Sequence, residues 1–244
     1  AFTVSPENLG DAIRGMRAMG FCGMNVTAPH KIEVIKYLDE ISADAKLLNS
    51  VNTVVNKNGI LTGYNTDSEG FYLSLKNAGV KVENADILVM GCGGVVIPAL
   101  TGIIKYNPKS ITLLNRTKAK DEKLAEDIFN ITGYRIKTCM ETDSFDIIIN
   151  TTSAGMGEQK NVLPWESINE LSGIDSITPK SVAVDMIYNP PKTEFLKYAE
   201  GKGAKTINGL DMLIYQGLLA YELFTDTKLP DNMAELLRKE VFGI

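Results

Sequence analysis

The 244-residue sequence contains little cysteine or histidine, with three cysteines and a single histidine. Cys22, Cys92 and Cys139 are odd in number and lack the paired spacing of metal-binding or redox motifs. A free cysteine that packs as a small apolar side chain is the ordinary structural use of this residue. We therefore expect three free thiols, no metal site and a location in the reducing cytoplasm.

Two further features are missing. No apolar run approaches the length that spans a membrane. The net charge is −5 and no basic stripe stands out, which argues against a nucleic-acid-binding surface. The content of 44% hydrophobic and 23% charged residues is ordinary for a soluble globular protein, and the length allows one large domain or two small ones. We expect neither a membrane nor a nucleic-acid partner.

The order of the predicted elements divides the chain into three blocks. Residues 1–66 mix strands and helices, with a strand expected at 1–4, a helix at 31–38, and a hairpin around Asn58-Gly59. Residues 67–208 alternate strands and helices, the pattern of a doubly wound parallel sheet. Residues 209–244 read as two helices with no strand after them, and we expect them to pack on the first block.

A glycine-rich segment, Gly91-Cys92-Gly93-Gly94, follows an apolar strand and precedes a predicted helix. Gly91 permits a tight turn, and Gly93 lets the backbone approach a diphosphate at the helix N-terminus. Val96 stands where a third small residue is usual, which predicts a slightly wider spacing of helix and strand. The segment predicts a dinucleotide site; the alternative is a glycine turn that binds nothing.

The end of the next strand indicates the type of nucleotide. Asn115-Arg116-Thr117-Lys118 and Lys120 follow it, and the acidic residue that binds the ribose hydroxyl in NAD-preferring sheets is absent. A guanidinium, a hydroxyl and ammonium groups suit a 2′-phosphate. The pattern favours NADP, and the alternative is a solvated basic helix start.

Two polar segments at strand–helix junctions complete the pattern. Asn25-Val26-Thr27-Ala28-Pro29-His30-Lys31 ends with a lysine at a predicted helix start, and Asn65-Thr66-Asp67 places a carboxylate at another junction. Brought together, Lys31 and Asp67 form a charge pair that can hold and pass a proton. Beside a dinucleotide site, such a pair equips a protein to reduce a carbonyl. The alternative is a surface ion pair of little energetic value.

Taken together, eight ordered motifs resemble those of the shikimate dehydrogenase family along nearly the whole chain. They are Met24–Lys31 (Met-Asn-Val-Thr-x-Pro-His-Lys), Ser50–Val54, Gly63–Asp67, Gly91–Gly94, Asn115–Thr117, Asn150–Met156, Asp185–Pro190 and Asn208–Gln216. The resemblance implies reversible NADPH-dependent reduction of 3-dehydroshikimate to shikimate, in aromatic amino acid biosynthesis. It implies an α/β fold in which a Rossmann-like domain, 67–208, joins a smaller discontinuous substrate domain formed by 1–66 and 209–244.

The resemblance also implies roles for individual residues. Lys31 and Asp67 match the family's catalytic pair, and whether Lys31 gives the proton or chiefly polarises the carbonyl stays open. The residues expected to contact the polyhydroxylated substrate are Asn25, Thr27, Asn52, Asp67, Tyr188 and Gln216. The residues expected at the cofactor are Gly91, Cys92, Gly93, Gly94, Val95, Asn115, Arg116, Thr117, Lys120, Thr151, Thr152, Ser153, Met186, Gly209 and Met212.

The chain departs from the family's pattern at its start and after the glycines. The family begins with a strand, a Ser-x-Ser segment and a helix that do not occur before Ala1, and we expect residues outside the given sequence to supply them. Val95, Val96 and Ile97 replace small residues and an arginine.

Two alternatives to a shikimate dehydrogenase stay open. They are a quinate/shikimate dehydrogenase with broader substrate or NAD use, and a non-catalytic NADP-binding descendant. A monomer and a homodimer are both compatible with the sequence.

Overall fold

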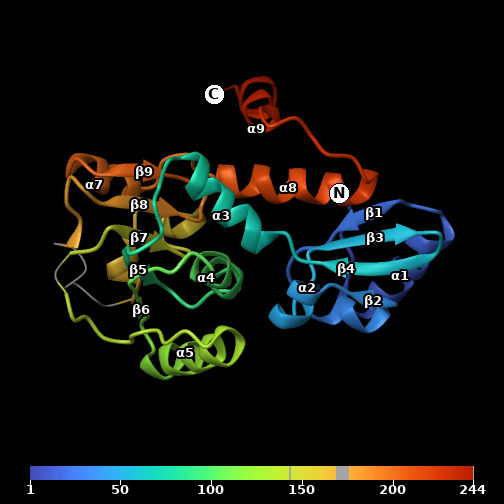
Figure 1. Ribbon diagram of the computed structural model, residues 1–244, viewed down its shortest axis with the longest axis horizontal. Helices are drawn as coiled ribbons and strands as arrows, with labels where there is room; N and C mark the ends of the chain where they lie inside the picture. Colours follow the sequence, from blue (N-terminus) through green and yellow to red (C-terminus); the bar gives the residue numbers. More distant parts are fainter. Residues whose placement is uncertain (143, 169–175, 244) are drawn as a thin grey trace. The chain divides into compact units, whose positions relative to one another are not determined.

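The computed structural model describes residues 1–142, 144–168 and 176–243 (Figure 1). The chain forms two compact units. Unit 1 consists of Ala1–Gly70 and Ile214–Ile244, and unit 2 of Phe71–Leu213. Both contain a β-sheet with helices, so the fold class is α/β, as predicted. None of the helices in the described ranges combines the length and the apolar character needed to cross a lipid bilayer.

Unit 2 is built on a five-stranded parallel sheet in the order β6-β5-β7-β8-β9. The strands are β5 (Asp86–Met90), β6 (Ser110–Leu114), β7 (Ile147–Asn150), β8 (Val182–Asp185) and β9 (Lys205–Ile207). Lys137 forms a parallel bridge with Thr112 on the free side of β6, in the place of a further strand. From β5 the chain continues to β6 on one side of β5 and later returns to β7 on its other side. The direction in which strands are added to the sheet therefore reverses between β5 and β7. Such a switch point opens a crevice at the carboxyl ends of the strands, where ligands bind in open α/β sheets.

Helices cover both faces of this sheet, which explains the continuous apolar runs of its strands. Ile87 and Val89 of β5 point into one buried cluster, and Leu88 and Met90 into another. The helices of unit 2 are α4 (Val96–Ile104), α5 (Lys118–Thr132), α6 (Pro164–Ile168) and α7 (Glu194–Gly201), joined by most of α3 (Asp67–Asn77). The predicted doubly wound sheet is confirmed, whereas the three-residue strand β9 was not predicted.

Unit 1 contains a four-stranded mixed sheet in the order β1-β3-β4-β2. Its strands are β1 (Gly23–Asn25), β2 (Glu40–Ile41), β3 (Thr53–Lys57) and β4 (Ile60–Tyr64). The β3–β4 connection is the predicted hairpin, with φ of 55° at Asn58 and 86° at Gly59, as its two-residue turn requires. The helices are α1 (Leu9–Ala18), α2 (Ala43–Leu48), α9 (Met233–Leu237) and the greater part of α8 (Leu210–Thr225).

One local prediction for this unit is wrong and a second is confirmed only in part. Residues 1–4 form no strand, and Phe2 is 86% exposed. Within 31–38 the structure has only a short 3₁₀ helix, Glu33–Tyr37. Short apolar patterns such as those in 1–4 and 31–38 are weak signals, because tertiary packing decides which local structure they adopt.

The C-terminal helices belong to unit 1 by close packing. A Cβ on Gly23 of β1 would overlap the ring of Phe224 on α8. A Cβ on Gly70 of α3 would lie 2.9 Å from the backbone nitrogen of Gln216, so α3 and α8 approach closely at this glycine.

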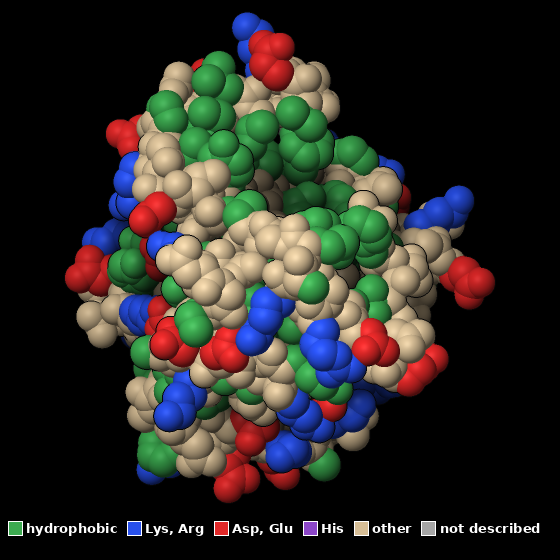
Figure 2. All heavy atoms as spheres, turned by 90° about the vertical axis from the view of Figure 1, so that its right-hand side faces the viewer, with side chains coloured by type: hydrophobic (Ala, Val, Ile, Leu, Met, Phe, Trp, Pro, Cys, Tyr) green, Lys and Arg blue, Asp and Glu red, His purple; other side chains and the backbone are tan. Residues whose placement is uncertain are grey.

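Figure 2 shows charged side chains of both signs over the lower part of one face and hydrophobic side chains gathered above them. Phe2, Phe21 and Tyr221 are among the exposed apolar side chains of the unit.

Candidate active site

Lys31 and Asp67 form an ion pair in unit 1. Lys31 Nζ donates to Asp67 Oδ2 at 2.8 Å. Lys31 is held through its backbone, whose carbonyl accepts from the Val51 N–H at 2.8 Å, and Asp67 is the first residue of α3. The side chain of Asp67 is 9% exposed and that of Lys31 is 28% exposed. The carboxylate is therefore shielded, while the ammonium retains a solvent-accessible side.

Asn52 holds the buried carboxylate in place. Its Nδ2 donates to Asp67 Oδ1 at 2.8 Å, and its Oδ1 accepts from the Thr66 N–H at 2.9 Å. Asp67 also donates its backbone N–H to Asn65 Oδ1, a local turn that begins α3. Asn52 is only 2% exposed. Its amide is thus used within the protein, and its geometry suits orienting Asp67 more than direct contact with a ligand.

The other predicted substrate residues are distributed over both units. Gln216 lies beside Asn52, with 3.5 Å between Gln216 Oε1 and Asn52 Nδ2. Asn25 donates to Thr53 Oγ1 at 3.2 Å, and both Asn25 and Thr27 are exposed. Tyr188 belongs to unit 2 and is 50% exposed. Within unit 1 the structure therefore brings Lys31, Asp67, Asn52 and Gln216 into one cluster.

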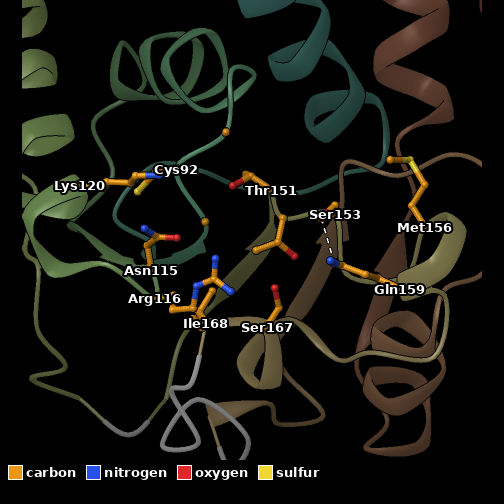
Figure 3. Close-up of a pocket in the computed structure, with 13 residues that line it drawn as sticks. Cys92, Asn115, Arg116, Lys120, Thr151, Ser153, Met156, Gln159, Ser167 and Ile168 are labelled. Carbon is orange, nitrogen blue, oxygen red and sulfur yellow. Dashed lines mark hydrogen bonds between the residues drawn. The ribbon is translucent and has the colours of Figure 1, made fainter.

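A cavity of about 500 Å³ lies in unit 2 at the carboxyl ends of β5, β6 and β7 (Figure 3). Predicted residues form most of its lining: Gly91, Cys92, Gly93, Asn115, Arg116, Lys120, Thr151, Thr152 and Ser153. The other lining residues within the described ranges are Met156, Gln159, Ser167 and Ile168, which were not predicted as site residues. The predicted residues Gly94, Val95, Thr117, Met186, Gly209 and Met212 do not line it.

The unpredicted lining residues come from the segment that follows β7. Met156 ends a recognised motif, so its position offered a signal. Gln159 accepts a hydrogen bond from Ser153 Oγ at 3.0 Å, which Figure 3 marks with a dashed line. Ser167 and Ile168 end the short helix α6. Nothing in the local sequence of these last three residues distinguishes them from an ordinary surface segment.

The geometry of the cavity fits a dinucleotide. Gly91 has φ of 101°, and a Cβ there would lie 2.8 Å from Thr152 Cγ2. A Cβ on Gly93 would lie 3.2 Å from the Thr151 carbonyl oxygen. Only residues without a side chain let the loops after β5 and β7 approach this closely. The N-terminus of α4 follows the glycines and favours anionic groups.

The charge of the cavity supports the same conclusion. Arg116 and Lys120 both line it, and no acidic side chain does so among the described residues. In Figure 3 the guanidinium of Arg116 extends from the end of β6 toward the side chains that follow β7. A guanidinium forms paired hydrogen bonds to phosphate oxygens. The residues present therefore fit a ligand with a diphosphate and an additional phosphate.

Two residues predicted at the nicotinamide lie together elsewhere in unit 2. A Cβ on Gly209 would overlap the Met186 carbonyl oxygen, and the Gly209 N–H donates to the Ile187 carbonyl at 3.0 Å. Gly209 immediately precedes α8, which carries Met212. The absence of a side chain at residue 209 thus allows the start of α8 to reach the loop after β8.

A buried polar network supports the ends of β7 and β8. Asp185 Oδ1 accepts from Asn150 Nδ2 at 3.0 Å and from the Ile187 N–H at 3.0 Å, and Oδ2 accepts from Thr193 Oγ1 at 2.6 Å. Burial raises the pKa of Asp185 to about 6, against the opposing effect of these hydrogen bonds. Asn150 Oδ1 also accepts from Thr152. The network therefore connects a cavity-lining loop to the loop that carries Met186.

Comparisons with known proteins agree with this geometry. Residues 1–54 match the family model of the shikimate dehydrogenase substrate binding domain, and residues 209–241 match that of the shikimate 5′-dehydrogenase C-terminal domain. The chain is 43% identical over 236 residues to the shikimate dehydrogenase (NADP(+)) of Methanococcus aeolicus. That alignment covers 95% of this chain and 82% of the relative.

Solved structures give the same family. A crystal structure of a shikimate dehydrogenase in complex with NADP+ has a TM-score of 0.85 and 38% identity, covering 97% of this chain and 82% of that one. Shikimate 5-dehydrogenase from Listeria monocytogenes, in complex with shikimate and NAD, has a TM-score of 0.84 and 32% identity, covering 97% and 84%. On this sequence identity over nearly its full length, the chain belongs to the shikimate dehydrogenase family.

Proposed function

We propose that the chain catalyses the reversible NADP-dependent reduction of 3-dehydroshikimate to shikimate, a step of aromatic amino acid biosynthesis. The observation that carries this proposal is the Lys31–Asp67 pair, oriented by Asn52, in a chain whose glycine-rich cavity fits NADP. Membership of the family supplies the substrate, since its curated relatives are NADP-dependent shikimate dehydrogenases.

The basic residues of unit 2 would hold the cofactor. The backbone around Gly91 and Gly93 would receive the diphosphate, and Arg116 with Lys120 would receive the 2′-phosphate. When bound, NADPH supplies the hydride that reduces the substrate carbonyl. The two phosphate-binding side chains carry the preference for NADP over NAD, because NAD lacks the group that they would neutralise.

Lys31 acts on the oxygen of the substrate carbonyl as an electrostatic stabiliser and proton donor. As hydride reaches the carbon, negative charge develops on this oxygen, and an ammonium group within hydrogen-bonding distance stabilises the charge and donates a proton. In the reverse direction the neutral amine accepts the proton of the shikimate hydroxyl. Asp67 keeps Lys31 oriented at 2.8 Å and, through its second oxygen, is itself fixed by Asn52.

The polar side chains around this pair would recognise the substrate hydroxyls. Asn25 and Thr27 are exposed and offer directed donors and acceptors, as does Gln216 next to Asn52. Tyr188, which is half-exposed in unit 2, stays a proposed substrate-binding residue because its hydroxyl can donate and accept hydrogen bonds. We assign substrate binding to residues 1–66 with 209–244, and cofactor binding to residues 67–208, a division close to that of the two compact units.

Two alternative functions differ in one assay. A quinate/shikimate dehydrogenase would oxidise quinate as well, and it is not favoured because the curated relatives are shikimate dehydrogenases. A non-catalytic NADP-binding protein would bind the cofactor without turnover. The buried, fully oriented Asp67 argues against this second alternative, since binding alone does not need it.

Exposed free thiols at Cys22 and Cys139 favour the cytoplasm, and the protein is proposed to act there as a monomer or homodimer.

Variants at Lys31 test the mechanism. Lys31→Met removes the charge and the proton at similar length, whereas Lys31→Arg retains the charge on a group that does not release its proton in proteins. If Lys31 donates the proton, both variants lose turnover while binding NADP+ normally by calorimetry. If its charge alone were needed, Lys31→Arg would retain most of the rate. Unchanged turnover in Lys31→Met would contradict the catalytic role altogether.

A further inference from the structure

Asp121 is a buried carboxylate behind the cofactor cavity. It lies in the first turn of α5, is only 2% exposed, and is not among the described residues that line the cavity. A buried carboxylate is costly unless hydrogen-bond donors compensate it. Burial raises the pKa of Asp121, against the opposing effect of the nearby hydrogen-bond donors.

The two groups that donate to Asp121 come from different loops. The Cys92 thiol lies 3.3 Å from Asp121 Oδ1, a normal length for a sulfur donor, and the backbone N–H of Asn115 is the other donor. Cys92 belongs to the glycine segment after β5, and Asn115 to the segment after β6. Both residues line the cavity, so one carboxylate connects two of its walls.

We propose that Asp121 is a positioning residue for NADP: it fixes the glycine segment through Cys92 and the phosphate-binding segment through Asn115. The inference rests on the proposed function, because it concerns the cofactor that this cavity would bind. Arg116 follows Asn115 directly, so a shift of the Asn115 backbone moves the guanidinium. Cys92 lies between Gly91 and Gly93, so its thiol restrains the turn that would receive the diphosphate.

The same contact controls the chemistry of the thiol. Burial and the neighbouring Asp121 carboxylate raise the pKa of Cys92 to about 12, and Lys120 opposes them. The thiol therefore stays protonated, remains a hydrogen-bond donor and reacts slowly with electrophiles, because the thiolate is the reactive form. Thiol reactivity consequently reports on the Asp121 contact without any need for turnover.

The test uses the full chain in a Cys22→Ser/Cys139→Ser background, in which Cys92 is the remaining thiol. Both replaced cysteines are exposed. Asp121→Ala removes both acceptor contacts, and Asp121→Asn removes the charge while an amide oxygen can still accept from Asn115. Glu126→Ala is the matched control, since it removes an exposed carboxylate from the same helix. Dissociation constants for NADP+ come from calorimetry, and Cys92 alkylation rates from mass spectrometry.

The expected result is a split between the variants. Asp121→Ala weakens NADP+ binding about tenfold, the usual effect of removing a hydrogen bond to a charged group, while kcat at saturating cofactor changes much less. Asp121→Asn weakens it about threefold or less. Both Asp121 variants raise the alkylation rate of Cys92 at pH 8. In the Cys22→Ser/Cys139→Ser parent, NADP+ protects Cys92 from alkylation. Glu126→Ala changes neither the NADP+ dissociation constant nor the alkylation rate.

Other outcomes separate the two proposals. Parent protein that binds NADP+, together with Asp121→Ala that binds equally well, overturns the positioning role alone. Parent protein that binds no NADP+ overturns the proposed function and this inference with it. Should Asp121→Ala prove unfolded by circular dichroism, Asp121→Asn decides: an unchanged alkylation rate for Cys92 contradicts the Asp121 contact.

Discussion

Replacing the buried Asp185 by asparagine should stabilise unit 2 at neutral pH. The carboxyl is fully buried, and its pKa is raised from an ordinary 3.8 to about 6. Because the pKa is raised, the folded state holds a proton that the unfolded state has already lost. The folded state is therefore destabilised progressively as the pH rises from about 4 to about 6, and this loss is complete above pH 6.

The size of the effect follows from the shift. A difference of about two pKa units corresponds to ~3 kcal/mol, at 1.36 kcal/mol per unit. Asparagine avoids this cost because it does not ionise. Its oxygen can accept from Asn150 and the Ile187 N–H as Asp185 does, and its amide can donate to Thr193 Oγ1. We expect Asp185→Asn to be more stable than the parent by ~1–3 kcal/mol at pH 7 and similar to it at pH 4.

Urea unfolding between pH 4 and 8 measures this difference. Trp165 is the sole tryptophan, lies in the core of unit 2 and packs edge-on against Phe195, so its fluorescence reports on that unit. Asp185→Ala is the control: it leaves the donors of Asn150, Ile187 and Thr193 without their acceptor and should destabilise at every pH. A stability difference between parent and Asp185→Asn that does not change with pH would refute the reasoning.

Three further predictions concern the site. Lys31→Met should lower kcat by roughly 10²–10⁴-fold, the range for loss of a general acid, with the NADP+ dissociation constant unchanged by calorimetry; a loss of binding equal to the loss of rate would count against catalysis. Arg116→Ala should weaken NADP+ binding roughly 10- to 100-fold through the lost charged hydrogen bonds but leave NAD+ binding nearly unchanged, and equal losses for both cofactors would remove the 2′-phosphate assignment. Gly91→Ala should destabilise unit 2 by ~1–3 kcal/mol, because φ is 101° and the new Cβ would crowd Thr152; unaltered urea unfolding of Trp165 would contradict this strain.

The sequence was sufficient to predict the elements that carry strong local signals. β5 is apolar on both faces and is followed by glycines, so a buried parallel strand and a nucleotide turn could both be predicted. The turn at Asn58-Gly59 accepts positive φ, which made the hairpin predictable. The pairing of Lys31 with Asp67 was inferred from two strand–helix junctions, and the structure places the two side chains in contact.

Other features depend on tertiary contacts that no local pattern encodes. Residues 1–4 alternate like a strand but form none, and β9 is too short to produce a periodic signal. Gln159 and Ser167 line the cavity at the glycine-rich turn only because the chain after β7 returns to the edge of the sheet. In the sequence, Asp121 is one of several charged residues of a polar predicted helix. Only the three-dimensional structure shows that it is buried next to Cys92.

The most direct test of the proposed function follows absorbance at 340 nm when purified protein is mixed with shikimate and NADP+. Parallel samples contain NAD+ in place of NADP+, or quinate in place of shikimate, and the Lys31→Met variant is run beside the parent. We expect a rise in absorbance with shikimate and NADP+, a much weaker rise in the parallel samples, and almost none with the variant. Protein that binds NADP+ by calorimetry yet produces no rise with shikimate would contradict the proposed function.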